Sequence, residues 1–322
     1  MVCLAAGQVI AEGVDSADRW IARMIDATRS LDFEGSFVYF NGSGISSARV
    51  VHEVAESGEE VQRLYALNGP EREVIRQDRK TTLLLSDGKE LSYADQFQSS
   101  LFPLVPTRDL DTLATSYRFE LGPEDRVAGR PCQEISIKPL DEYRYGYNLW
   151  LDRETAVLMR ADLLDRDGKR LEQLMFTEIT IRQPSSGSGA GNASSATREA
   201  ATGEGAATVA QSADSSAVLA RAADWRVEGG PPGFEEVYRA RKASAPGEFT
   251  DHLVLSDGLA TVSVHAQPLA SAASAVEGES HMGAVSAYAK VVGEHQVYVV
   301  GEVPQATVRA VAEALRGPED SR

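Results

Sequence analysis

The first apolar repeat along the chain predicts an amphipathic helix from Asp15 to Leu31. Apolar side chains recur there every three or four residues, which places them on one face of a helix. Asp15 and Ser16 precede the repeat, and both residue types favour a helix N-cap. The residues on the apolar face are Trp20, Ile21, Met24, Ile25 and Leu31.

The apolar period changes to two between Ser36 and Arg182, which predicts β-strands with one buried face. Clear alternation occurs in 117–121, 145–151 and 157–163, although Trp150 interrupts the second run. Four turn dipeptides separate the runs: Asn41-Gly42, Asn68-Gly69, Asp87-Gly88 and Asp167-Gly168. Such dipeptides favour tight hairpins because they adopt positive φ at little steric cost. The pattern therefore predicts a meandering antiparallel sheet of about eleven strands, curved into a partly open barrel.

Residues 183–223 are dominated by Ser, Gly, Ala and Thr and have no apolar period, so we expect a flexible linker. A second pattern follows in 224–316. It predicts a hairpin that turns at Asp257-Gly258, strands in 284–292 and 296–300, and a helix that opens at Pro304. We expect an α+β protein, with a large antiparallel half-barrel domain in 15–182, a smaller α+β domain in 224–316 and a frayed tail in 317–322.

The length of 322 residues suggests about two globular domains. The net charge of −16 argues against nucleic acid as a partner, because a nucleic-acid binder concentrates Lys and Arg. Residues 1–14 begin with an apolar run that has no basic n-region, so they are expected to be a residual signal segment or a frayed terminus. No run reaches the roughly 18 apolar residues of a membrane-spanning helix.

Catalytic and metal-binding constellations are absent from the sequence. The five histidines show no His-Glu-x-x-His spacing, and there is neither a P-loop nor a dinucleotide fingerprint after a strand. Cys3 and Cys132 form no disulfide framework, and Cys132 is expected to be a small buried hydrophobe. We therefore expect a non-catalytic binding protein with no cofactor and no metal.

The apolar face of the curved sheet is the candidate binding site, since a half-barrel can hold an acyl chain or a partner helix. For each single residue the alternative is ordinary core packing against the N-terminal helix. The candidates for lining this groove are Phe37, Tyr39, Tyr93, Phe102, Tyr145, Tyr147, Leu149 and Met159.

Several blocks of the sequence resemble the RseB/MucB family of periplasmic regulators of sigma-E type (AlgU-like) sigma factors. They form an ordered series over both expected domains. The most specific block is 145–152, together with its continuation in 159–173. The blocks are Asn-Gly-Pro-Glu-Arg-Glu-Val in 68–74, 145–152, Gly-Phe-Glu-Glu-Val in 233–237, Leu-Ser-Asp-Gly in 255–258 and Val-Gly-Glu-Val-Pro in 300–304.

The resemblance implies a location, a fold and partners. Members of the family are periplasmic and bind the periplasmic domain of a membrane-bound anti-sigma factor (RseA/MucA-like), which they shield from site-1 proteolysis. Lipid or lipopolysaccharide signals, through their acyl chains, release them. The larger domain resembles the LolA and LolB lipoprotein carriers and receptors.

Two alternatives remain at this level: a periplasmic lipoprotein or lipid carrier that uses the same groove, and an envelope hydrolase. The contacts with the anti-sigma factor, the identity of the lipid and the domain orientation are open. A homodimer is possible, because an unclosed sheet has an edge that can pair with another subunit.

Overall fold

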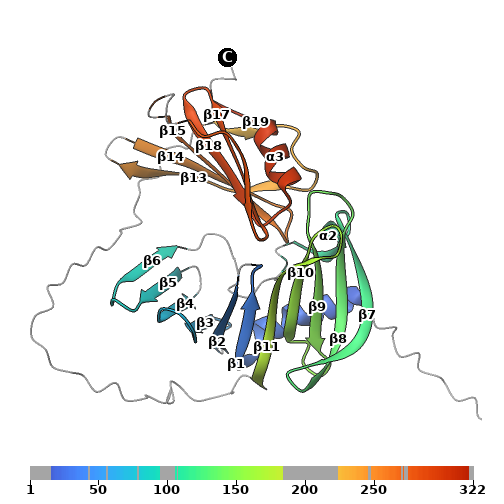
Figure 1. Ribbon diagram of the computed structural model, residues 1–322. Coiled ribbons are helices and arrows are strands. Elements are labelled where there is room, and N and C mark those ends of the chain that lie inside the picture. Colours follow the sequence, from blue (N-terminus) through green and yellow to red (C-terminus); the bar gives the residue numbers. More distant parts are fainter. Residues whose placement is uncertain are drawn as a thin grey trace, which may run out of the picture.

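The computed structural model describes residues 16–42, 44–55, 57–77, 80–94, 106, 108–183, 224–245, 248–269, 271 and 275–318 (Figure 1). The expected signal segment 1–14 lies outside these residues. Also outside them are Phe102, residues 184–223 of the expected linker, and positions 319–322 of the expected tail. None of the helices in the described ranges combines the length and the apolarity that crossing a bilayer requires.

Helix α1 (Ala17–Ser30) forms at the predicted position. The Ser16 side chain caps it by accepting a hydrogen bond from the Arg19 backbone nitrogen at 3.3 Å. Trp20, Ile21 and Met24 are buried in the core of the N-terminal sheet, as their spacing predicts. Their burial holds the helix against the β7–β8 side of that sheet.

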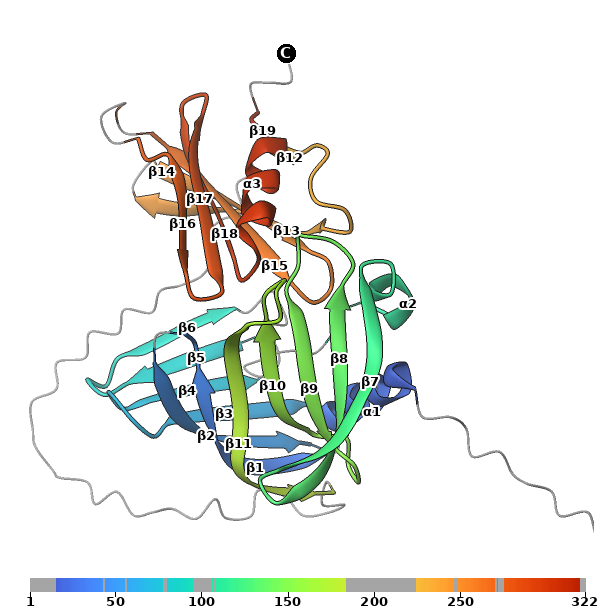
Figure 2. The same cartoon turned by 45° about the vertical axis from the view of Figure 1, so that its right-hand side comes forward.

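Eleven antiparallel strands form the N-terminal sheet in the order β6-β5-β4-β3-β2-β1-β11-β10-β9-β8-β7. Neighbouring strands are consecutive in sequence except at β1 and β11, where the start and the end of the domain pair. Figure 2 shows how the sheet curves from β6 to β7. The strands are β1 (Asp32–Phe40), β2 (Ile45–Val54), β3 (Glu60–Ala66), β4 (Arg72–Gln77), β5 (Lys80–Leu85), β6 (Glu90–Ala94), β7 (Tyr117–Val127), β8 (Arg130–Pro139), β9 (Gly146–Asp152), β10 (Leu158–Leu164) and β11 (Arg170–Arg182).

The predicted turn dipeptides join these strands. The four turn glycines, Gly42, Gly69, Gly88 and Gly168, all have positive φ. That conformation is easily accessible to glycine, so these turns follow directly from local sequence. A short helix, α2 (Leu110–Leu113), precedes β7 and is capped by Asp109.

Trp150 breaks the alternation of β9 for a reason that the structure makes plain. Its side chain points away from the Leu149 and Leu151 face and is only 5% exposed. The Arg160 guanidinium lies 3.9 Å from the Trp150 ring centroid, so a cation–π contact covers an aromatic residue on the outer face.

The C-terminal domain is a six-stranded antiparallel sheet, in the order β13-β14-β15-β18-β17-β16, with helix α3 (Gln305–Ala314) packed on one face. Pro304 occupies the N-cap of α3, one position before the first helical residue. Val308, Val311 and Ala312 of α3 are buried in the core of this domain. The strands are β12 (Arg226–Val227), β13 (Glu235–Ala245), β14 (Glu248–Ser256), β15 (Thr261–Pro268), β16 (Gly278–Met282), β17 (Val285–Val292), β18 (His295–Gly301) and β19 (Leu315–Arg316), of which β12 and β19 pair separately.

Candidate functional site: a pocket at the domain junction

The inner face of the N-terminal sheet carries side chains in continuous cross-strand rows. Leu163 of β10 lies opposite Tyr147 of β9 and Glu172 of β11. Two residues along β10, Ala161 lies opposite Leu149 and Leu174. Residues that face each other across antiparallel strands point to the same side of the sheet, so these rows form one surface that runs across several strands.

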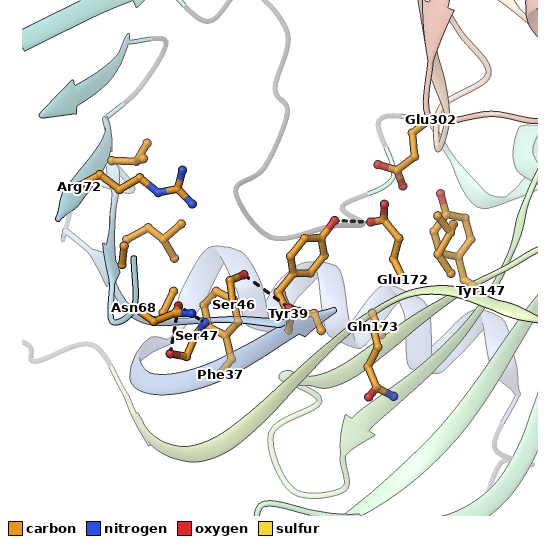
Figure 3. Close-up of a pocket in the computed structure, with 17 residues that line it drawn as sticks. Phe37, Tyr39, Ser46, Ser47, Asn68, Arg72, Tyr147, Glu172, Gln173 and Glu302 are labelled. Carbon is orange, nitrogen blue, oxygen red and sulfur yellow. Dashed lines mark hydrogen bonds between the residues drawn. The ribbon is translucent and has the colours of Figure 1, made fainter. Parts of the chain in front are cut away.

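A pocket of about 380 Å³ lies over these rows (Figure 3). Its size falls in the range of small-molecule sites, and its exposed lining is more apolar than polar. Every lining residue except Glu302 comes from the N-terminal domain; Glu302 follows β18 of the C-terminal domain. The lining residues are Phe37, Tyr39, Ser46, Ser47, Ala48, Leu64, Ala66, Asn68, Arg72, Val74, Tyr147, Ala161, Leu163, Glu172, Gln173, Leu174 and Glu302.

Three of the predicted groove residues, Phe37, Tyr39 and Tyr147, line this pocket. Leu149 and Met159 are in the domain core and retain no accessible surface. Helix α1 is packed into the same core, so protein side chains fill the space around these two residues and leave no room for a ligand. Ligand contact at Leu149 and Met159 is therefore not expected in this conformation.

Tyr145 is half-buried beside the core and makes a side-chain hydrogen bond with Ser286 of the C-terminal domain instead of lining the pocket. The Tyr93 side chain and all of Phe102 are outside the described part of the chain. The role of these two residues in ligand binding stays a prediction.

The polar end of the pocket contains residues that the apolar pattern does not single out. The Tyr39 hydroxyl donates a short hydrogen bond to the Glu172 carboxylate. Burial and the Glu172 carboxylate raise the pKa of Tyr39 well above its ordinary value. Glu172 has a recognisable signal in the sequence, because Leu174 and Phe176 follow it at alternate, inward-facing positions.

Glu302 faces Glu172 from the other domain. Its side chain remains accessible to solvent, yet the protein atoms around the pocket desolvate the carboxylate. That burial and the repulsion from Glu172 raise the pKa of Glu302 to about 7. At neutral pH this carboxyl group therefore exchanges between its neutral and its charged form.

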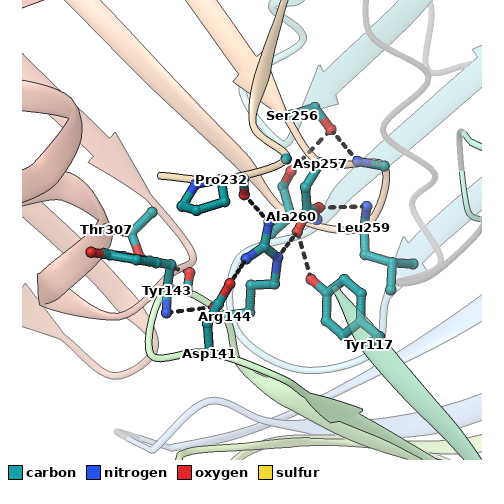
Figure 4. A network of polar contacts seen from close by, with 12 residues as sticks. Tyr117, Asp141, Tyr143, Arg144, Pro232, Ser256, Asp257, Leu259, Ala260 and Thr307 are labelled. Atoms are coloured by element: carbon teal, nitrogen blue, oxygen red, sulfur yellow. Dashed lines mark hydrogen bonds and ion pairs between the residues drawn. The ribbon is translucent and has the colours of Figure 1, made fainter. Parts of the chain in front are cut away.

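A buried ion-pair network joins the two domains beside the pocket (Figure 4). Arg144, in the loop between β8 and β9, donates from Nε to Asp257 Oδ2 at 2.6 Å. It also makes short contacts with the Asp141 carboxylate and the Pro232 carbonyl oxygen. The Tyr117 hydroxyl donates to the same Asp257 oxygen at 2.8 Å. The side chains of Arg144 and Asp257 are 0% and 1% exposed, so this contact is fully desolvated.

The network satisfies its buried charges. Burial lowers the pKa of Arg144, but the nearby Asp257 and Asp141 carboxylates outweigh it and raise the pKa overall. The second oxygen of Asp257 accepts backbone hydrogen bonds from Leu259 and Ala260 at 2.9 and 2.8 Å. A buried pair with its remaining hydrogen-bonding groups satisfied is costly to break, so the network restricts how the domains are oriented.

Close packing at the junction needs glycine at position 233. Gly233 has φ +78°, and a Cβ there would lie 2.7 Å from Arg144 Nη2 and 3.0 Å from Ser116 Oγ. Thr307 of α3 adds a hydrogen bond to the Tyr143 carbonyl oxygen at 2.7 Å. Part of the network falls in the sequence blocks 145–152, 233–237 and 255–258 or next to them.

No described group of three or more His, Cys, Asp or Glu side chains is arranged to hold a metal ion. Cys132 is buried, and burial raises the pKa of its thiol to about 11, which keeps it protonated at neutral pH. The arrangement of the site favours binding of a partly apolar ligand.

Comparisons with known proteins agree over nearly the whole chain. The family model of the MucB/RseB N-terminal domain matches residues 16–200, and that of the C-terminal domain matches residues 220–316. The sigma factor AlgU regulatory protein MucB of Pseudomonas aeruginosa is 32% identical over 311 residues, covering 95% of this chain and 92% of MucB. The sigma-E factor regulatory protein RseB of Escherichia coli K12 is 28% identical over 306 residues, covering 90% and 87%.

Two solved structures have the same fold over most of the chain. The Pseudomonas aeruginosa MucA/MucB complex matches with a TM-score of 0.68 and 30% identity, over 94% of this chain and 98% of that chain. MucB in complex with MucA(peri) matches with a TM-score of 0.67, 30% identity and the same coverage. Both domain models and the relatives therefore lead to one conclusion: this chain belongs to the MucB/RseB family.

Proposed function

We propose that this protein is a periplasmic, non-catalytic regulator that binds the periplasmic part of an anti-sigma factor. The relatives are named as regulatory proteins of sigma factors, and one of them, MucB, has been solved in complex with MucA. The two-domain architecture and the size of the chain match that relative throughout. Binding shields the anti-sigma segment from site-1 proteolysis, and release exposes it.

The observation that carries the proposal is that residues of both domains line one pocket. A ligand that binds there contacts the N-terminal sheet and Glu302 together, so its affinity depends on how the domains are placed. A ligand shifts a conformational equilibrium only when it binds the two states unequally. A ligand in a pocket between two domains binds different domain arrangements unequally, because its contacts change with the arrangement. A ligand enclosed within one domain keeps the same contacts in every arrangement.

The release signal in this proposal is an acyl chain of lipid or lipopolysaccharide. Phe37, Ala161 and Leu174 provide an apolar floor for such a chain. Occupation of the pocket favours a domain arrangement with lower affinity for the anti-sigma segment. The coupling free energy between two such sites is typically about 1–3 kcal/mol, or roughly 5- to 150-fold in affinity.

A protease-protection assay tests the proposal. The cognate anti-sigma periplasmic fragment is incubated with its site-1 protease, with and without this protein, and lysophospholipid is then titrated into the protected mixture. Protection that is lost as lipid is added is the expected result. Unchanged cleavage in the absence of lipid would refute anti-sigma shielding, and protection that persists at saturating lipid would refute the release mechanism.

A pocket-filling variant separates the two activities. Ala161→Phe adds a ring in the middle of the apolar floor, and Ala22→Phe adds the same volume at an exposed position of α1. The Ala161 variant is expected to retain protection and lose the response to lipid, whereas the Ala22 variant retains both. Tight lipid binding without any affinity for the anti-sigma fragment would favour the alternative function of a lipid or lipoprotein carrier.

A further inference from the structure

Two carboxylates from different domains face each other at one end of the pocket (Figure 3). Glu172 projects from β11, and Glu302 projects from the turn between β18 and α3. Their interaction is repulsive, since Glu172 is one of the two causes that raise the pKa of Glu302. An arrangement of this kind is unfavourable without a compensating positive charge.

The described part of the chain does not supply that charge. Neither glutamate forms an ion pair with a described Lys, Arg or His side chain, and no basic group contributes to the shift at Glu302. Arg72, the basic residue in the pocket lining, is on the far side of the pocket from Glu302 (Figure 3). The groups around the two carboxylates are the hydroxyls of Tyr39, Tyr145 and Tyr147.

Tyr147 is a second, independent sign of a ligand. Its side chain lines the pocket, and only 7% of the residue is accessible. Within the described residues its hydroxyl has no hydrogen-bond partner, unlike the Tyr39 hydroxyl, which donates to Glu172. The hydroxyl opens into the pocket, where a ligand with a hydrogen-bonding group can pair with it.

We propose that Glu172, Glu302 and Tyr147 bind the cationic head of an amphiphile, a primary ammonium whose apolar tail lies over Phe37, Ala161 and Leu174. An ammonium has three donors and no acceptor, and the three groups offer carboxylate and hydroxyl oxygens. Hydrogen bonds between charged partners are the strongest of their kind, so the head group determines which end of the ligand lies at the domain junction. The apolar floor begins directly beside the carboxylates, because Leu163 and Glu172 are cross-strand neighbours.

Proton release accompanies this binding. With a pKa of about 7, Glu302 is partly protonated at neutral pH, and an ammonium nearby favours its ionised form. Affinity for a permanently charged ammonium ligand should therefore rise as pH increases through 7 and level off above it. Between pH 6 and pH 8 the ionised fraction of a group with this pKa changes by roughly tenfold, which sets the upper limit of the change in affinity because solvent screens the side chain.

The test compares decylammonium with 1-decanol, which has the same chain length and no charge, by isothermal titration calorimetry on the full chain. At pH 8 the ammonium is expected to bind at least about tenfold more tightly than the alcohol, because its head gains charged hydrogen bonds. At pH 6 that preference should be smaller, with about tenfold as the upper limit of the decrease. Equal affinities of the two compounds at pH 8 would overturn the proposal.

Three conservative variants locate the effect. Glu302→Gln and Glu172→Gln should each remove most of the preference for the ammonium and leave decanol binding intact; Tyr147→Phe should remove a smaller part. Glu313→Gln, at an exposed position of α3, is the matched control and should behave as wild type. An unchanged preference in Glu302→Gln, with the variant still binding decanol, would also overturn the proposal.

A short lysine-bearing peptide distinguishes a protein ligand from a small amphiphile. Failure of the peptide to displace decylammonium is expected, whereas displacement at equal concentration would assign the carboxylates to a protein segment and reject the amphiphile. These titrations use no anti-sigma fragment. Their failure is therefore distinguishable from failure of the proposed regulatory function, which the protease-protection assay measures separately.

Discussion

Two contacts between the domains each contain two carboxylates, but only one of them has a basic side chain between the negative charges. Near Arg144, the Asp257 and Asp141 carboxylates have a buried guanidinium between them. At the pocket, Glu172 and Glu302 face each other with no described basic partner. The first contact is complete and stabilises the junction. The second lacks a described basic partner, and the pKa of Glu302 is raised there, as expected where a protein keeps a charged site open for a ligand.

The comparison also shows why the pocket lies where it does. The Arg144 network places the C-terminal domain over one end of the N-terminal sheet, and α1 fills the core near β7 and β8. The remaining inner face lines the pocket beneath Glu302 with side chains from β4 to β9 in the order of the sheet. A ligand in the pocket therefore acts on the contact at Glu302, while the Arg144 network limits how far the domain arrangement can change in response.

Breaking the complete contact should have the largest effect. Arg144→Met leaves the Asp257 carboxylate buried without its ion partner, so we expect a loss of about 3–5 kcal/mol in the free energy of unfolding. Urea denaturation followed by tryptophan fluorescence measures it. Arg166→Met, with a side chain 76% exposed, is the control and should change stability by less than about 0.5 kcal/mol. Similar stabilities for the two variants would show that the network contributes little.

Supplying the missing charge should convert the second contact into one like the first. Leu163→Lys places an ammonium opposite Glu172 in the β10–β11 pairing. The substitution itself costs apolar burial, but its cost should be about 1–3 kcal/mol smaller with Glu172 present than in a Glu172→Gln background. A double-mutant cycle by urea denaturation measures this coupling. Leu163→Met in both backgrounds should give a coupling near zero, and a zero coupling for lysine would contradict the prediction.

The smallest expected effect is a change in the pH dependence of stability. The folded-state pKa of Glu302 is raised from 4.5 to about 7, so the folded protein binds more protons than the unfolded chain between those values. Wild type should therefore lose stability relative to Glu302→Gln as pH rises from about 4.5 to about 7, with a constant difference outside that window. We expect less than about 1 kcal/mol, because solvent reaches the side chain and screens it. Thermal melts of the two proteins from pH 4 to pH 8 measure this. A stability difference that stays constant over the whole range would contradict the raised pKa of Glu302.

Local sequence signals predicted much of the scaffold. The helical spacing of Trp20, Ile21 and Met24 placed α1, and the glycine turns at 42 and 168 placed two of the hairpins. These features depend on interactions between residues close in the chain, which sequence patterns report directly. The curved antiparallel sheet and the smaller second domain were likewise expected and are present.

The pocket was predicted only in part. Phe37, Tyr39 and Tyr147 were expected to line a groove and do line the pocket, whereas Leu149 and Met159 belong to the core. All five have the same apolar periodicity, which identifies the inner face without showing how far α1 covers it. The carboxylates were not predicted, because a search for apolar linings passes over charged residues.

The sequence by itself determined many of the strands, the glycine turns, the amphipathic helices and the succession of a large sheet and a smaller second domain, since each depends on local periodicity and backbone preference. The tertiary structure alone decided that Arg144 meets Asp257, 113 positions away, and that Glu172 meets Glu302. Such charge pairs depend on how two separately folded sheets dock, and a one-dimensional pattern contains no record of that geometry. The physical difference between a locked and an open contact therefore appears only when both domains are in place.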